Sequence, residues 1–138
     1  MTQQSQFKVS TPGRGTIDIT PQVEQFVHES NIQTGLANVF ISHTSASLIL
    51  CENADAMVRT DLESWLSRAV PDGDRLFRHT MEGPDDMPAH IRGAVTDVSL
   101  SIPVGDGRPV LGTWQGIYLF EHRVRPHSRS VVLHLSGE

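Results

Sequence analysis

The sequence predicts a single α+β domain built mainly from antiparallel strands. Its 138 residues are close to the commonest size of one domain, and a chain of this length can bury a core without disulfides or structural metals. Short apolar runs rich in β-branched residues recur along the chain, and two or three helical segments are set between pairs of strands. Because helices and strands do not alternate regularly, we expect antiparallel, sandwich-like sheets over residues 1–138.

A hairpin and a helix are expected at the beginning of the chain. Phe7–Ser10 and Thr16–Ile19 are apolar-polar runs that flank the segment Thr-Pro-Gly-Arg-Gly. Glycine and proline between two such runs favour a tight turn, so we expect the two strands to pair with each other. Thr20 can cap a helix that begins at Pro21, and Gly35 should end it.

The next segments predict two strands and a longer helix. Leu36–Ser42 and Ser47–Leu50 are rich in apolar and β-branched residues, and the polar residues His43-Thr44-Ser45 join them. Asn53 is a candidate N-cap of a helix that ends before Pro71. Its expected buried face consists of apolar residues at helical spacing: Val58, Leu62, Trp65, Leu66 and Ala69.

The second half predicts a long loop, a short helix and the closing strands. Pro71–Pro88 is rich in Pro, Gly and Asp, and a loop of this length in a compact domain is usually functional, so we expect it to form a wall of the site. A short helix should begin at its end. The remaining elements are a strand through Leu100, Ile102 and Val104, a turn at Gly105-Asp106-Gly107, and strands within Val110–Val124 and Ser130–Leu135.

Composition excludes several classes of protein. Eleven Lys and Arg face sixteen Asp and Glu, and the scattered basic residues offer no stripe for nucleic acid. No apolar stretch approaches the roughly 18 to 20 residues that span a membrane. The only cysteine, Cys51, cannot form an internal disulfide, and the N-terminal segment lacks the pattern of a signal peptide, so we expect a cytoplasmic protein.

Histidines supply the first candidates for chemistry. His43 follows a predicted strand, where a neutral imidazole could bind a metal ion or accept a proton, although an ordinary turn histidine would look the same. His79 and His90 flank the acidic segment Glu82–Asp86, and they could meet at one metal ion or one substrate. Their spacing matches no standard zinc signature. His122 also lies beside a carboxylate.

Two further regions carry candidate groups. Asp61 lies at the edge of the predicted helix's buried face, so it could point into a cleft or simply pair with a neighbouring arginine. Leu111–Gly116 contains two glycines, which often mark a bulge or a close approach to a ligand. Trp114 and Gln115 could then offer a stacking face and an amide, or Trp114 could belong to the core. Glu121 could act as an acid or base.

Four segments together resemble the YjbQ family: His43-Thr-Ser-Ala-Ser-Leu, Glu52-Asn-Ala-Asp, Glu82-Gly-Pro-Asp-Asp-Met-Pro-Ala-His-Ile and Gly112-Thr-Trp-Gln-Gly-Ile. The resemblance extends over nearly the whole chain. Proteins of that family form α+β sandwich domains, assemble as trimers and are described as secondary thiamine-phosphate synthases of weak activity. The resemblance therefore implies a homotrimer that joins hydroxymethylpyrimidine diphosphate to a thiazole phosphate and releases pyrophosphate.

The resemblance also implies the residues of the site. The expected catalytic residues are His43, Asp61 and Glu121. The expected substrate-binding residues are Asn53, Thr113, Trp114, Gln115 and Arg129. A divalent metal ion, zinc or magnesium, would be held by His43, His79 and His90. Arg129 could bind a phosphate or form a surface ion pair.

Two other functions are compatible with the same residues. One is a metal-assisted hydrolase that acts on a different phosphorylated metabolite. The other is a trimer that binds its small phosphorylated ligand without turning it over, because weak activity in the resembled family allows binding without catalysis.

Overall fold

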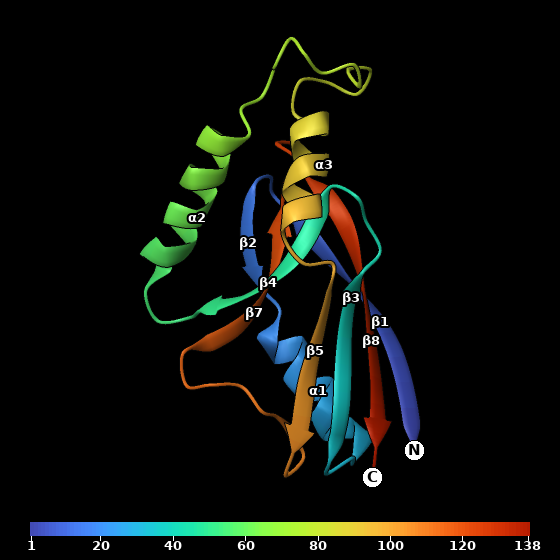
Figure 1. The fold of residues 1–138 in the computed structure, drawn as a ribbon. Helices are drawn as coiled ribbons and strands as arrows, with labels where there is room; N and C mark the ends of the chain where they lie inside the picture. Colours follow the sequence, from blue (N-terminus) through green and yellow to red (C-terminus); the bar gives the residue numbers. More distant parts are fainter.

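The computed structural model describes residues 1–138 and contains eight strands and three helices (Figure 1). The strands are β1 Thr2–Thr11, β2 Gly15–Asp18, β3 Gly35–Ile41, β4 Ala46–Glu52, β5 Ser99–Gly105, β6 Arg108–Pro109, β7 Gln115–Glu121 and β8 His127–Gly137. The helices are α1 Thr20–Ser30, α2 Ala56–Ala69 and α3 Asp86–Val95. Antiparallel pairing gives a larger sheet in the order β1-β8-β3-β5-β6 and a smaller sheet in the order β2-β7-β4. The predicted α+β class is confirmed.

The large sheet is covered on its inner face by two different partners. The smaller sheet covers one half, where Val39 and Ile41 of β3 share a fully apolar core with Leu48 of β4 and Leu119 of β7. Helix α1 covers the other half, and its Val27 belongs to a second apolar cluster (Figure 1). Fully burying each such side chain contributes about 1.5–3 kcal/mol. Helix α3 and the loops lie at the upper ends of the strands in Figure 1.

The first two strands do not form the predicted hairpin. β1 pairs with β8 and β2 pairs with β7, so the two strands belong to different sheets. The predicted turn exists, with Gly13 and Gly15 at φ values of 140° and 138°, but it carries the chain from one sheet to the other. Turn residues determine only where the chain bends. The partner of each strand is determined by which face is buried, and Val9 of β1 lies in the core between the sheets.

Helix α1 differs from the prediction in where it ends and in the role of Thr20 at its start. It ends at Ser30 instead of continuing to Gly35, because Asn31 takes the left-handed conformation, with a φ of 62°, that commonly ends helices. The Thr20 side chain does not cap the helix. Its Oγ1 instead accepts a hydrogen bond of 2.8 Å from the backbone nitrogen of Ile117, which ties α1 to β7.

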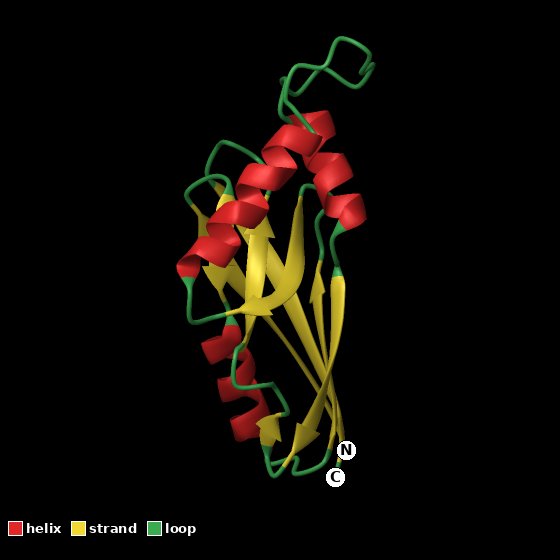
Figure 2. Ribbon diagram, turned by 60° about the vertical axis from the view of Figure 1, so that its left-hand side comes forward, coloured by secondary structure: helices red, strands yellow, loops and turns green.

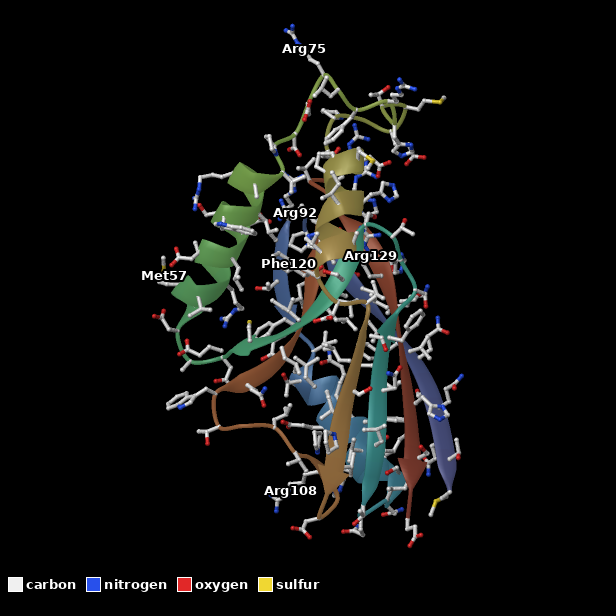
Figure 3. The ribbon with its side chains drawn as sticks, in the orientation of Figure 1. Met57, Arg75, Arg92, Arg108, Phe120 and Arg129 are labelled. Carbon is white, nitrogen blue, oxygen red and sulfur yellow. The ribbon has the colours of Figure 1, made fainter.

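Helix α2 is less buried than its pattern predicts. Asp55, and not Asn53, caps it by accepting a hydrogen bond of 2.9 Å from the backbone nitrogen of Met57. Of the expected buried face, only Leu66 is buried, whereas Trp65 is 57% exposed. Met57 also points outward (Figure 3). Met57, Leu62 and Trp65 of α2 are therefore left largely uncovered within one chain.

None of the three helices is long and apolar enough to cross a lipid bilayer.

The second half follows the prediction closely. α3 begins at Asp86, two residues before the Pro88 that was expected in its first turn. The predicted turn between β5 and β6 has positive φ values at Asp106 and Gly107. The strand predicted within Val110–Val124 is limited to Gln115–Glu121. Residues 70–85 form the predicted long loop, which projects beyond the ends of α2 and α3 (Figure 2).

Candidate functional site

Two histidines and an aspartate meet where the long loop enters α3. Asp86 Oδ2 lies 2.6 Å from His79 Nε2 and 3.5 Å from His90 Nε2. The two imidazole rings are 5.1 Å apart and nearly perpendicular. Asp86 and His90 are four residues apart on α3, so they share one face of the helix. The loop that precedes α3 places His79 beside these two residues.

This cluster has the donor set of a divalent metal site. One ligand atom from each of the three side chains lies within 4.8 Å of the other two. Two imidazoles and one carboxylate suit zinc and similar transition metals better than magnesium, which prefers oxygen ligands, and they leave coordination positions open. Asp86 is the third group here, and His43 is not part of the cluster. The sequence did not identify this aspartate, because the predicted helix began at Pro88 and left Asp86 in the loop.

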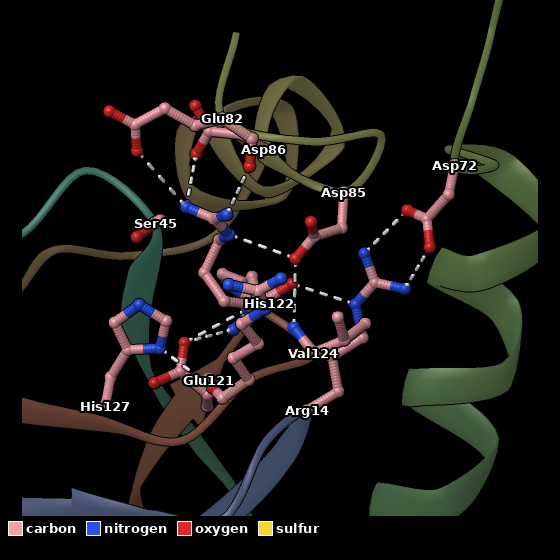
Figure 4. Close-up of polar contacts among 12 residues, drawn as sticks. Arg14, Ser45, Asp72, Glu82, Asp85, Asp86, Glu121, His122, Val124 and His127 are labelled. Atoms are coloured by element: carbon pink, nitrogen blue, oxygen red, sulfur yellow. Dashed lines mark hydrogen bonds and ion pairs between the residues drawn. The ribbon is translucent and has the colours of Figure 1, made fainter. Parts of the chain in front are cut away.

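Arg123, which follows β7, holds the acidic segment in place. Its Nη1 donates to Asp86 Oδ1 at 2.8 Å, its Nε to Asp85 Oδ2 at 3.0 Å and its Nη2 to the carbonyl of Glu82 at 2.9 Å (Figure 4). Burial disfavours ionisation of Asp85, but hydrogen bonds from Val124 and Arg123 outweigh it and hold the pKa of this carboxyl below its usual value. Both aspartates are therefore fixed by one guanidinium.

A second polar group lies between the two sheets at the upper end of the strands. Arg129 of β8, labelled in Figure 3, donates from Nε to Glu121 Oε1 at 2.7 Å and from Nη2 to Glu121 Oε2 at 2.5 Å. Glu121 is fully buried and also accepts from Thr11 Oγ1 at 2.6 Å. Burial would raise the pKa of Glu121, but these hydrogen bonds lower it. Glu121 therefore orients Arg129 and has no free surface for a substrate.

His43 lies between two surface cavities. One, of about 470 Å³, extends toward Phe40 and Arg129. The other, of about 270 Å³, extends toward His90. They share three lining residues: His43, Thr44 and Val98. The two cavities therefore adjoin at His43, and we call them together the groove: it extends from Arg129 past His43 to His90, one histidine of the candidate metal cluster.

His122 belongs to a closed hydrogen-bonded ring beneath α3. Its Nδ1 accepts from Arg92 Nε at 3.2 Å, and its Nε2 lies 2.7 Å from Ser47 Oγ. Ser47 contacts Thr96 Oγ1 at 2.6 Å, and Thr96 donates to the Arg92 carbonyl at 2.7 Å. Burial and the neighbouring Arg92 lower the pKa of His122 to about 3. His122 is therefore a neutral structural residue. Arg92 also pairs with Glu63 of α2.

The predicted substrate-binding residues of the glycine-rich segment lie at the other end of the small sheet. Asn53 donates from its backbone nitrogen to the Trp114 carbonyl at 2.9 Å. Gln115 begins β7 and Glu121 ends it, so the two groups are roughly 20 Å apart at about 3.3 Å per residue. Thr113 and Trp114 are exposed. Within one chain these residues do not join the groove.

Asp61 is also separate from the groove. It lies on the exposed side of α2 and makes no hydrogen bond or ion pair with another side chain. Glu63, two residues later, is the acidic residue of α2 that reaches the interior, through its ion pair with Arg92. The sequence pattern placed Asp61 at the edge of the buried face of α2. In the structure the helix is rotated so that Glu63, and not Asp61, points toward the interior.

Comparison with known proteins agrees with the resemblance seen in the sequence. A family model described as UPF0047 protein YjbQ-like matches residues 5–138. A UPF0047 protein of Synechocystis sp. is 50% identical over 130 residues, which cover 94% of this chain and 88% of that protein. YjbQ of Escherichia coli O157:H7 is 41% identical over 139 residues and both chains are covered completely, at 100% each. The crystal structure of a YjbQ/UPF0047 protein from Clostridium acetobutylicum gives a TM-score of 0.88 at 35% identity, covering 96% of this chain and 99% of that one. The chain belongs to the YjbQ/UPF0047 family.

Proposed function

We propose that the protein is a cytoplasmic enzyme that transfers a group from a phosphorylated small molecule with the help of a divalent metal ion. The observation that carries this proposal is the His79, Asp86 and His90 cluster at the end of the groove that contains His43. Cleaving a bond to a diphosphate requires positive charge where the leaving group develops negative charge. Arg129, at the other end of the groove, supplies guanidinium hydrogen-bond donors, and Lys8, which contacts the neighbouring Ser130, supplies a positive charge.

The thiamine-phosphate synthase reaction implied by the family resemblance makes this demand. The bond between the pyrimidine methylene carbon and the diphosphate oxygen breaks, and its electron pair leaves with pyrophosphate. The ring nitrogen of the thiazole phosphate forms the new bond to that carbon. His79, Asp86 and His90 would hold the metal ion, which when bound neutralises charge on the departing diphosphate. Arg123 keeps Asp86 in place for this role.

We also propose that the protein acts as a homotrimer. Trp114 is 62% exposed and Trp65 is 57% exposed, which is uncommon for side chains that remain in water. The backbone contact between Asn53 and Trp114 places this segment beside the start of α2, which exposes its Met57 and Trp65. A second copy of the chain is the partner that the proposal assigns to this surface. Its Asn53 and Gln115 could then complete the groove of a neighbour.

The test is pyrophosphate release from hydroxymethylpyrimidine diphosphate and the thiazole phosphate. Metal-free protein is compared with protein loaded with Zn²⁺ or Mg²⁺, and His90→Ala is compared with His28→Ala, which changes an exposed histidine of α1. The proposal expects metal-dependent release that His90→Ala reduces at least about tenfold, in line with disruption of a metal site, and that His28→Ala leaves unchanged. Equal rates for metal-free and metal-loaded protein would contradict it.

A metal-assisted hydrolase is the second candidate. The observation that favours it is the same donor set, because two histidines and one carboxylate with open positions can also bind and activate a water molecule. A panel of phosphate esters distinguishes the two. Much faster release of inorganic phosphate from another ester supports the hydrolase. Binding of phosphorylated ligands without any turnover supports a ligand-binding trimer.

A further inference from the structure

His43 is fixed in one protonation form by a backbone contact. Its Nε2 lies 2.8 Å from the backbone nitrogen of Ser130, which can only donate a hydrogen bond. Nε2 is therefore an unprotonated acceptor, and we assign the single proton of the neutral ring to Nδ1. Burial and the positive charge of Arg129 lower the pKa of His43, which agrees with a neutral ring at pH 7.

The proton on Nδ1 faces another donor. Nη1 of Arg129 lies 3.4 Å from His43 Nδ1, and a guanidinium nitrogen offers only protons. The two groups cannot satisfy each other. The other nitrogens of Arg129 have acceptors, because Nε and Nη2 bind Glu121 and Nη2 also binds Ser45 Oγ. Nη1 is left without an acceptor in the chain, although the Arg129 side chain is only 5% exposed.

The charges around this pair favour an anion. The negative charge of Glu121 balances the positive charge of Arg129. Lys8 adds a further positive charge, because its Nζ lies 2.5 Å from the hydroxyl of Ser130, the residue whose backbone contacts His43. An oxygen of a carboxylate or phosphate placed between the two donors would accept from both, and charge-assisted hydrogen bonds of this kind are the strong ones.

We propose that His43 Nδ1 and Arg129 Nη1 together bind one oxyanion of a ligand in the cavity of about 470 Å³ that both residues line. Phe40 and Val98 line the same cavity and are 42% and 41% exposed. They offer apolar surface for a ring attached to the oxyanion. This inference deepens the proposed function, because it states where a phosphorylated substrate is held, but it does not require a bound metal ion.

The test uses metal-free, ¹⁵N-labelled protein of the full chain. Long-range ¹H–¹⁵N spectra report which nitrogen of His43 carries the proton, and phenyl phosphate, benzoate and inorganic phosphate are the titrated probes. We expect the proton on Nδ1, and we expect phenyl phosphate or benzoate to shift the His43 and Arg129 side-chain resonances. Arg129 is not mutated, because removing one partner of its buried ion pair could unfold the chain.

Two variants separate the parts of the site. His43→Ala should weaken binding of the aromatic probe about tenfold or more, the loss expected for one charge-assisted hydrogen bond, whereas His28→Ala should leave it unchanged. Phe40→Ala should weaken phenyl phosphate but not inorganic phosphate. Whichever of phenyl phosphate and benzoate binds more tightly identifies the oxyanion as a phosphate or a carboxylate.

Three results would overturn the inference. They are a proton on Nε2 of His43, no binding of either aromatic probe, and equal binding by the parent protein and His43→Ala. Since the protein carries no metal in this experiment, a failure of metal-dependent turnover leaves the result intact. A failure of oxyanion binding likewise leaves the metal cluster to be tested separately.

Discussion

Arg123 and Asp86 form a contact that links the end of β7 to the candidate metal cluster. The guanidinium binds Asp86 Oδ1 at 2.8 Å, and the other oxygen, Oδ2, faces His79 and His90. The Asp86 carboxylate is therefore oriented by Arg123 without a bound ion, and its Oδ2 faces the position that a metal ion would take. Such outer partners of a metal ligand are worth about 10–100-fold in metal affinity.

Replacing Arg123 should therefore weaken metal binding. Arg123→Ala should lower the Zn²⁺ affinity about 10–100-fold, and Arg123→Lys should recover part of the loss. The matched control is Arg125→Ala, because Arg125 is exposed and its side chain makes no hydrogen bond. Calorimetric titration gives the affinities, and circular dichroism checks the fold. Equal affinities for Arg123→Ala and Arg125→Ala would show that Arg123 has no such role.

Glu121 should make stability depend on acid pH. Its folded pKa lies below the ordinary value of 4.5, so between the two values the unfolded chain binds a proton that the folded chain does not. The stabilisation is present above pH 4.5 and is lost as the pH falls through the folded pKa. Glu121→Gln should cost about 3–5 kcal/mol at pH 7, because Arg129 is left buried without its partner. Urea unfolding at several pH values measures both effects, and a parent-like free energy for the variant would contradict them.

His122 should remain neutral over the physiological range. Its folded pKa is lowered from 6.5 to about 3, so the unfolded state takes up a proton at higher pH than the folded state. The free energy of unfolding should therefore fall as the pH is lowered from 6.5 toward 3. NMR titration of the imidazole between pH 8 and pH 5 should show no midpoint. A midpoint near 6.5 would mean that the ring is not enclosed with Arg92 as described.

The exposed apolar surface of α2 should be an interface between copies. Trp65→Ser and Trp114→Ser should shift sedimentation from trimer toward monomer, because each removes apolar area that only a neighbouring chain can cover. Leu36→Ser, on the outer face of the large sheet and 48% exposed in the parent, is the matched control. Dissociation caused by Leu36→Ser alone would move the interface to that sheet. A monomeric parent protein would remove the trimer from the proposal.

The sequence predicted elements better than their partners. Alternating and helical patterns are local, so the strands around Val39 and Val131 and the helix around Leu66 were predicted from neighbouring residues alone. Pairing is not local. The glycine-rich turn before β2 is compatible with a hairpin and with a crossover between sheets, and only burial of Val9 against both sheets decides between them.

The site was predicted in part for the same reason. Histidines beside an acidic loop indicated a cluster, and the structure brings His79 and His90 together. Asp86 was missed as a ligand, because the predicted helix began at Pro88 and left Asp86 in the loop, whereas α3 begins at Asp86. Arg123 could not be found, because its partners lie about 40 residues away in sequence and depend on how the loop returns to the sheet.

The most direct test of the account is a Zn²⁺ titration of the metal-free protein and of Asp86→Asn at pH 7, followed by calorimetry. We expect one tight site per chain in the parent protein and at least about tenfold weaker binding in the variant, which loses a charged ligand. A parent protein that binds no zinc, or a variant that binds it equally well, would contradict the proposed metal centre.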